Sequence, residues 1–409
     1  MHFSRRLGVL AIASTLIAGY FIGTPPLALG DTPGVTNSQI LLGGTHPFSG
    51  PAAAYGTISQ GIQAYFAYVN DHGGVYGRKI VYKDVDDGYN PAQTVQLVKQ
   101  LTEQDQVFAF FNTLGTAPNV AIQPYLNERK IPQLFIATGA TQFGLEGTKY
   151  PYTLLFNPDY QSEAQIFGKD LIAHDKNAKV AILYQNDDFG QDYVTGFQRA
   201  IAGKGPTVVK TASYEVTDAD VGSQMQALKA SGADTLLIAA TPKFAVQAMV
   251  IKAKLGWNPR TYLTDVSAAQ FLMQAATKAG GAGATNGIIT AEYVLDPTNP
   301  GMAGAPGMKL YREILSKYAP HADPSNAFVL YGMATAYTMV DTLKHAGKNP
   351  TRASLMNAAL HLNERNPFFI DGVMLSTSPT DRFPIRQEQL GKYVNGLFVP
   401  YGFVIDARK

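Results

Sequence analysis

The amino-acid sequence predicts an α/β fold made of two doubly wound, parallel-sheet lobes. The first observation is that short apolar runs alternate with longer stretches in which apolar residues recur at helical spacing. The second is that this alternation runs through residues 40–136 and begins again after residue 162. Strands that alternate with helices form parallel sheets covered by helices on both faces, so two successive series indicate two lobes.

The first series is predicted to contain four strands and three helices. The opening helix is expected because Ile58, Ile62 and Phe66 fall on one helical face. The next begins at Asn90-Pro91, where a proline in the first turn costs no hydrogen bond. The strands are predicted at residues 40–44, 79–85, 107–111 and 133–136, and the last helix at 118–129, opened by its proline.

The second series repeats the pattern, and the chain then changes character after Pro297. Turn signals at Asp371-Gly372 and Asn395-Gly396 indicate short strands joined by tight turns over residues 368–405. Strands are predicted at 179–183, 235–239, 261–264 and 287–290, and helices at 162–174, 191–202, 221–230, 246–255, 268–278, 308–318, 326–345 and 352–361.

Composition excludes several classes of function. The 409 residues include 33 Lys+Arg and 31 Asp+Glu, and Arg5 and Arg6 lie in a segment that we expect to be removed. A nearly neutral chain without basic clusters gives no electrostatic reason to bind nucleic acid or an anionic membrane. Cysteine is absent, which excludes disulfides, thiolate metal sites, cysteine nucleophiles and a lipidated cysteine anchor.

The first thirty residues have the pattern of an export signal. Arg5 and Arg6 precede an uncharged, mostly apolar run that Pro25 and Pro26 interrupt, and small residues stand near Gly30. We therefore predict that residues 1–30 are a signal peptide cleaved near Gly30 and that the mature chain is a soluble periplasmic protein. A transmembrane anchor is the alternative, and the choice between general secretion and twin-arginine export stays open.

Three loops after predicted strands are candidate ligand sites. Ligands of open parallel sheets bind beyond the carboxyl ends of the strands, where loops lead into helix N-termini. Hydroxyl groups and free N–H groups in such loops can hold a carboxylate or phosphate, although helix capping explains each loop taken alone. The candidates are His46 and Phe48 in the first loop, Thr113, Leu114, Gly115 and Thr116 in the second, and Thr138, Gly139 and Thr141 in the third.

An ordered set of short motifs resembles one known family. The chain contains FSGPAAAYG at 48–56, VNDHGGVYGR at 69–78, DDGYNP at 86–91, GAT at 139–141, DFG at 188–190 and LGW at 255–257. Each motif is weak by itself, but their order and spacing over nearly the whole mature chain resemble the leucine/isoleucine/valine-binding protein family. These are the type I periplasmic binding proteins of branched-chain amino acid importers.

The resemblance implies two lobes joined by three crossovers that close on a ligand. It places residues 31–157 and 292–375 in lobe 1, and 158–291 and 376–409 in lobe 2. It implies that residues 113–116 and 139–141 hold a ligand carboxylate, that Tyr55 packs on the ligand and that Phe189 is an aromatic lid. Tyr160, Thr241 and Asp265 are expected to face the cleft.

The ligand class depends on one acidic side chain. Amino acid binders of this family present an acidic group that falls near Val266 here, next to Asp265. If Asp265 does not reach the cleft, an ammonium would have no partner, and a buried unpaired charge is costly. We therefore favour an aromatic or other organic acid without an amine, with an amino acid or amide as the alternative.

No catalytic or metal-binding constellation stands out. Asp84, Asp86 and Asp87 lack the glutamate of a calcium loop, and the histidines have no metal-ligand spacing. The sequence therefore predicts a monomeric binding protein without cofactor or metal that delivers its ligand to the membrane permease of an ABC importer. A soluble sensor acting in trans and a secreted hydrolase are the alternatives; the hydrolase would need a nucleophile–base pair that is not recognisable.

Overall fold

The computed structural model describes residues 32–407, together with residue 2. The chain divides into two units, residues 1–31 and residues 32–409, and the description below concerns the second. The predicted signal peptide lies outside the described residues. Among the residues that are described, no helix has both the length and the hydrophobicity needed to cross a membrane.

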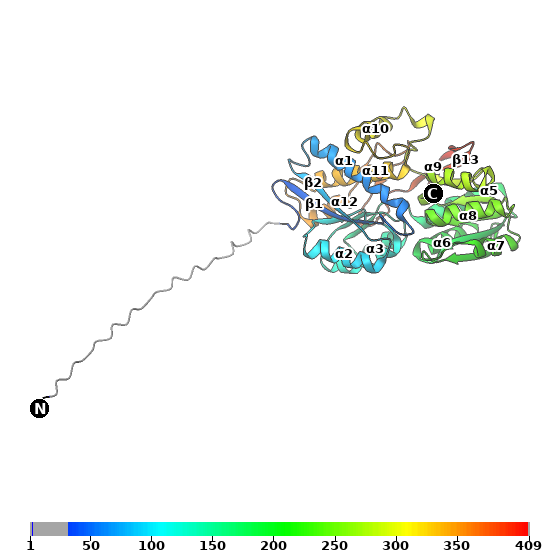
Figure 1. The fold of residues 1–409 in the computed structure, drawn as a ribbon, viewed down its shortest axis with the longest axis horizontal. Coiled ribbons are helices and arrows are strands. Elements are labelled where there is room, and N and C mark those ends of the chain that lie inside the picture. The colour runs from blue at the N-terminus through cyan, green and yellow to red at the C-terminus, as the bar shows by residue number, and fades with distance from the viewer. Residues whose placement is uncertain (1, 3–31, 408–409) are drawn as a thin grey trace. The chain divides into compact units, whose positions relative to one another are not determined.

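The first sheet is parallel and has the strand order β2-β1-β3-β4-β5. One face packs against α1 and α11, and the other packs against α2 and α3 (Figure 1). Because helices cover both faces, the central strand β3 is buried throughout. The strands are β1 (Gln39–His46), β2 (Lys79–Asp86), β3 (Ala109–Phe111), β4 (Gln133–Ile136) and β5 (Thr153–Leu155), and the helices are α1 (Ile58–Asp71), α2 (Pro91–Glu103), α3 (Thr116–Glu128) and α11 (Ala327–His345).

The second sheet has seven strands in the order β14-β13-β10-β9-β8-β6-β7. Along β6, Val180 and Ile182 pack into one core while Ala181 and Leu183 pack into the other, which explains its continuous apolar run. The strands are β6 (Lys179–Gln185), β7 (Thr207–Tyr214), β8 (Thr235–Ala239), β9 (Arg260–Leu263), β10 (Ile289–Glu292), β13 (Gln387–Val394) and β14 (Leu397–Asp406). The covering helices are α5 (Tyr160–His174), α6 (Asp188–Ile201), α7 (Gly222–Ala230), α8 (Pro242–Lys254) and α9 (Gln270–Gly280).

Three crossings of the chain join the two lobes. The first follows β5, and the second follows β10 and leads to α10 (Pro306–Tyr318), α11 and α12 (Arg352–Ala359), which pack with the first lobe. The third lies between the small hairpin of β11 (Asn363–Glu364) and β12 (Leu375–Ser376) and strand β13. The predicted fold of two parallel-sheet lobes joined by three crossovers is confirmed.

Several details differ from the sequence prediction. Helix α3 begins at Thr116 rather than Pro118, because Gly115 adopts a positive φ and ends the preceding turn. Strands β5 and β7 were not predicted: β5 is very short, and β7 lies at a sheet edge where much of it is exposed. Strands β13 and β14 pair antiparallel, and Asn395 and Gly396 form the predicted turn between them.

Candidate functional site

A cavity lies where the carboxyl ends of both sheets meet. Its lining follows β3 at Leu114, β5 at Asn157, β6 at Phe189, β8 at Thr241 and β9 at Asp265. In each sheet the first strand along the chain has the second strand on one side and the third to fifth strands on the other. Such a change of direction in the strand order opens a crevice at the carboxyl ends of the strands. The cavity measures about 120 Å³. A water needs only about 10–15 Å³ by this measure, so a small organic molecule can fit.

Aromatic rings form much of the cavity wall. Tyr55 packs on Phe328 with ring centroids 5.1 Å apart, and Tyr160 meets Phe189 edge-on at 5.1 Å. The first pair belongs to one lobe, and the second pair lies on α5 and α6 of the other. Rings that are packed against each other offer a rigid apolar surface to a ligand body. The other aromatic lining residues are Tyr89, Tyr293, Tyr331 and Phe398.

The N-terminus of α3 supplies hydrogen-bond donors to one side of the cavity. Gly115 precedes the helix with φ +99° and no side-chain cap, and it lines the cavity together with Thr116. A Cβ at Gly115 would lie 2.6 Å from Tyr89, so glycine is required for both backbone and space. Because the helix start is uncapped and Pro118 has no N–H, the N–H groups of Thr116 and Ala117 are the ones left for an acceptor such as a carboxylate.

Acidic groups also lie on the cavity wall or next to it. Asp265 lines the cavity, and its backbone N–H donates to Glu163 Oε1 over 2.9 Å. Burial raises the pKa of Asp265 to about 6 and raises the pKa values of Glu163 and Glu388 well above their usual range. Burial also raises the pKa of Glu292, another lining residue, to about 8. The lining residues include no Lys, Arg or His, so any positive charge in this cavity must come from a ligand.

The structure brings eight of the fourteen predicted site residues together. They come from both lobes, and in this structure all of them lie on the wall of one cavity. They are Tyr55, Leu114, Gly115, Thr116, Tyr160, Phe189, Thr241 and Asp265. Their contact with a ligand stays a prediction.

Four predicted residues from the second and third loops do not line the cavity. Their hydroxyl groups are engaged in bonds within the protein: Thr113 with Asn119, Thr138 with Thr116, and Thr141 with Asp159. Gly139 accepts a hydrogen bond from the Tyr160 N–H across 2.9 Å. These loops therefore shape the strand ends and the contact between lobes, and of the third loop only Ala137 lines the cavity.

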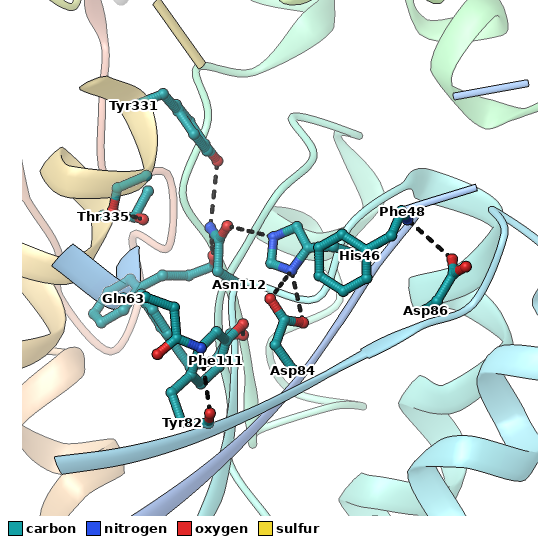
Figure 2. Close-up of polar contacts among 12 residues, drawn as sticks. His46, Phe48, Gln63, Tyr82, Asp84, Asp86, Phe111, Asn112, Tyr331 and Thr335 are labelled. Atoms are coloured by element: carbon teal, nitrogen blue, oxygen red, sulfur yellow. Dashed lines mark hydrogen bonds and ion pairs between the residues drawn. The ribbon is translucent and has the colours of Figure 1, made fainter. Parts of the chain in front are cut away.

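The two remaining predicted residues also lie outside the lining. Phe48 is 43% exposed, and its N–H donates to Asp86 Oδ1 over 2.9 Å. His46 is fully buried at the end of β1, between Asp84 and Asn112 (Figure 2). The acidic turn that raised the question of a metal thus pairs with a histidine and with backbone N–H groups.

Sequence reasoning missed part of the wall. Phe328 and Tyr331 lie on α11, which reads in the sequence only as an apolar core helix. No local sequence pattern distinguishes those two positions, because α11 reaches the strand ends only through tertiary packing. Asn157 and Tyr293 follow β5 and β10, and the strand-end rule could have found Tyr293 had the boundary of β10 been placed correctly.

Comparison with known proteins decides the family. The family model described as "Periplasmic binding protein" matches residues 39–386. The chain belongs to the periplasmic binding protein family. The match covers both sheets through the start of β13, and it confirms the resemblance inferred from the motifs.

Relatives of this periplasmic binding protein agree with the assignment. It is 24% identical over 338 residues to "Leu/Ile/Val-binding protein homolog 1" of Brucella abortus, covering 81% of this chain and 84% of the relative. The alignments to the first curated relatives span about half of those proteins, 54% and 52%.

Two solved structures share the fold of this periplasmic binding protein. One is a fatty acid ABC transporter substrate-binding protein from Thermomonospora curvata, with TM-score 0.78 and 24% identity over 92% of this chain and 95% of that one. The other is a branched chain amino acid ABC transporter protein from Thermus thermophilus with bound valine, with TM-score 0.79 and 19% identity over 91% and 97%. The chain accordingly has the fold of a periplasmic binding protein.

Proposed function

We propose that this chain is the exported solute-binding subunit of an ABC importer and that it captures a small carboxylate-bearing ligand between its lobes. The single observation that carries the proposal is a cavity whose wall is shared by the strand ends of both sheets. A ligand that contacts both lobes favours their closed arrangement, which a membrane permease can recognise. Both structural neighbours are described as ABC transporter proteins.

Within this function, an α-amino acid is the ligand class that the cavity favours. The expectation of an acid without an amine depended on Asp265 staying outside the cleft, and Asp265 lines it. The uncapped start of α3 suits a carboxylate, while Asp265 suits an ammonium in a cavity without basic residues. The aromatic wall suits an apolar side chain.

An organic acid without an amine is the second candidate. Because its pKa is about 8, Glu292 is protonated at neutral pH and can donate a hydrogen bond to a ligand carboxylate. A protonated Glu292 carries no charge, so it does not itself repel a ligand carboxylate. This candidate agrees with the fatty acid named for one structural neighbour.

Matched ligand pairs test the proposal. Titration calorimetry would compare L-leucine with 4-methylpentanoate, and L-phenylalanine with 3-phenylpropanoate, which differ only in the amine. We expect Asp265→Asn to weaken the amino acid about 10- to 100-fold, since a charged hydrogen bond contributes roughly 1.5–3 kcal/mol. We also expect amino acid affinity to rise from pH 5 to 7, because Asp265 ionises there.

The control is Asp175→Asn, which removes the same charge from an exposed position at the end of α5. It should leave every affinity unchanged. Tighter binding of the amine-free partner, unaffected by Asp265→Asn, would select the second candidate. Failure of all carboxylates to bind or to raise the melting temperature would sink the proposed ligand chemistry.

A further inference from the structure

A continuous chain of buried hydrogen bonds runs from His46 to the cavity wall. The His46 ring lies 2.9 Å from Asp84 at Nδ1 and 3.2 Å from Asn112 Oδ1 at Nε2. Asn112 Nδ2 is 3.4 Å from the hydroxyl of Tyr331, and that hydroxyl donates to Asn157 Oδ1 over 2.7 Å. Figure 2 shows Asp84, His46, Asn112 and Tyr331 joined one to the next by dashed lines. Tyr331 and Asn157 both line the cavity.

The direction of this chain is fixed at Asn112. Its Nδ2 donates to the carbonyl oxygen of Phe135 over 2.8 Å, and a carbonyl can only accept. The amide therefore turns Oδ1 toward His46, so His46 Nε2 must carry a hydrogen. Asn112 has φ +51°, so this side chain is held at a strained backbone position.

The protonation of His46 follows from its other neighbour. Nδ1 faces the Asp84 carboxylate, and an unprotonated Nδ1 would place two hydrogen-bond acceptors against each other. Both ring nitrogens of His46 therefore act as donors. Burial lowers the pKa of His46, but the charge and hydrogen bond of Asp84, the hydrogen bond to Asn112 and the charge of Asp87 together raise it above its usual range.

The far end of the chain reaches the ligand space. Asn157 lies in the first crossing between the lobes, after β5 and before α5. Its Oδ1 is occupied by the Tyr331 hydroxyl, so its Nδ2 group is the donor left for the cavity that Asn157 lines. Asn157 Nδ2 has no hydrogen-bond partner among the described residues. It is also not completely buried, so it is accessible from the cavity.

We propose that His46 is a positioning residue which, through Asn112 and Tyr331, holds Asn157 with its amide donor directed at the cavity and anchors the first crossing between the lobes. The inference rests on the proposed function in one respect only, namely that the Asn157 amide would donate to a ligand acceptor such as a carboxylate. The positioning itself concerns the ligand-free protein. His46 thus acts on the site without touching the ligand.

The test uses the whole protein without ligand, so its failure is distinct from failure of the proposed function. Nitrogen-15 NMR of the histidine rings, assigned with His46→Gln, should show both His46 nitrogens protonated at pH 7. Hydrogen exchange would follow the amides of Phe156 and Tyr160, which flank Asn157 and donate to Ile136 O and Gly139 O. In His46→Gln we expect these amides to exchange about tenfold faster, while amides of the second sheet are unchanged.

Two further variants separate positioning from general destabilisation. In Tyr331→Phe the chain is already broken, so adding His46→Gln should cause no further increase at Phe156 and Tyr160. Tyr82→Phe is the matched control, because it removes a buried bond to Phe111 O in the same sheet that does not lead to the cavity. A bare His46 nitrogen, additive effects of the two substitutions, or equal acceleration in Tyr82→Phe would each overturn the inference.

Discussion

Three buried carboxyl groups, those of Asp265, Glu163 and Glu388, interact electrostatically beside the cavity. Glu163 accepts from the Asp265 N–H and from the Tyr193 hydroxyl, so it has partners. Glu388 on β13 is 1% exposed, and neither of its carboxyl oxygens has a hydrogen-bond partner among the described residues. Carboxylates this close cannot all be ionised in a low dielectric, so the ligand-free cluster holds protons.

The stability of the ligand-free protein should therefore decrease as pH rises above the usual range of a glutamate. Burial raises the pKa of Glu388, so the folded protein retains a proton that the unfolded chain has already lost. The free energy of unfolding then falls with increasing pH. We expect Glu388→Gln to flatten this slope between pH 5 and 8 and to stabilise the protein by about 1–3 kcal/mol at pH 8. Urea unfolding at several pH values measures both, and an unchanged slope would contradict the assignment.

Close approach of two helices builds the wall that the sequence did not reveal. Gly61 on α1 and Gly332 on α11 face each other's helix: a Cβ at Gly61 would lie 1.9 Å from Val329 O, and one at Gly332 would lie 2.0 Å from Ile58 O. Only glycine permits this contact, which brings Phe328 to the cavity. The element that carries the aromatic wall is thus positioned by backbone-to-backbone packing.

Gly61→Ala should push α11 away from α1. Overpacking of this kind typically costs about 1–3 kcal/mol, and the displaced Phe328 should also weaken ligand binding. Gly283→Ala is the matched control, since no atom lies within 4 Å of a Cβ there. Thermal unfolding compares the two variants. Equal melting temperatures for both would show that the α1–α11 contact does not depend on glycine.

The whole molecule is interleaved rather than built as two successive domains. The chain leaves the first lobe, returns to it with α10 to α12, and finally completes the second sheet with β13 and β14. Leu390 joins one core of that sheet, while Tyr393 and Phe398 join the other. The second sheet and both of its cores are therefore complete only when β13 and β14 have joined them.

Truncation after Ser376 should abolish cooperative folding of the second lobe. It removes two strands of the sheet and the buried side chains of Leu390, Tyr393 and Phe398. Losing three large core side chains at roughly 2–5 kcal/mol each costs as much as the whole net stability of a typical domain, about 5–15 kcal/mol. A chain ending at Ala407 keeps both strands and serves as the control. A truncated protein with a single sharp calorimetric transition would contradict this expectation.

Local patterns in the sequence were sufficient for the fold class and for part of the site. Apolar runs and helical periodicity identified most strands and helices, because both faces of each sheet are buried and the runs are continuous. The loop that follows β3 was identified as a site because strand ends face a crevice in any parallel sheet. Ends of elements were less certain: a positive φ at Gly115 started α3 two residues before the expected proline.

Only the tertiary structure decided which polar groups line the cavity. Thr113, Thr141 and His46 have the residue types of a ligand site. The side chain of each is instead hydrogen-bonded to another side chain of the protein, Asn119, Asp159 and Asp84 respectively. Asp265 lines the cavity, which is why we propose an amino acid in place of the amine-free acid that the sequence led us to expect. A sequence specifies which groups exist and their local backbone, whereas hydrogen-bond partners depend on long-range contacts that no short pattern encodes.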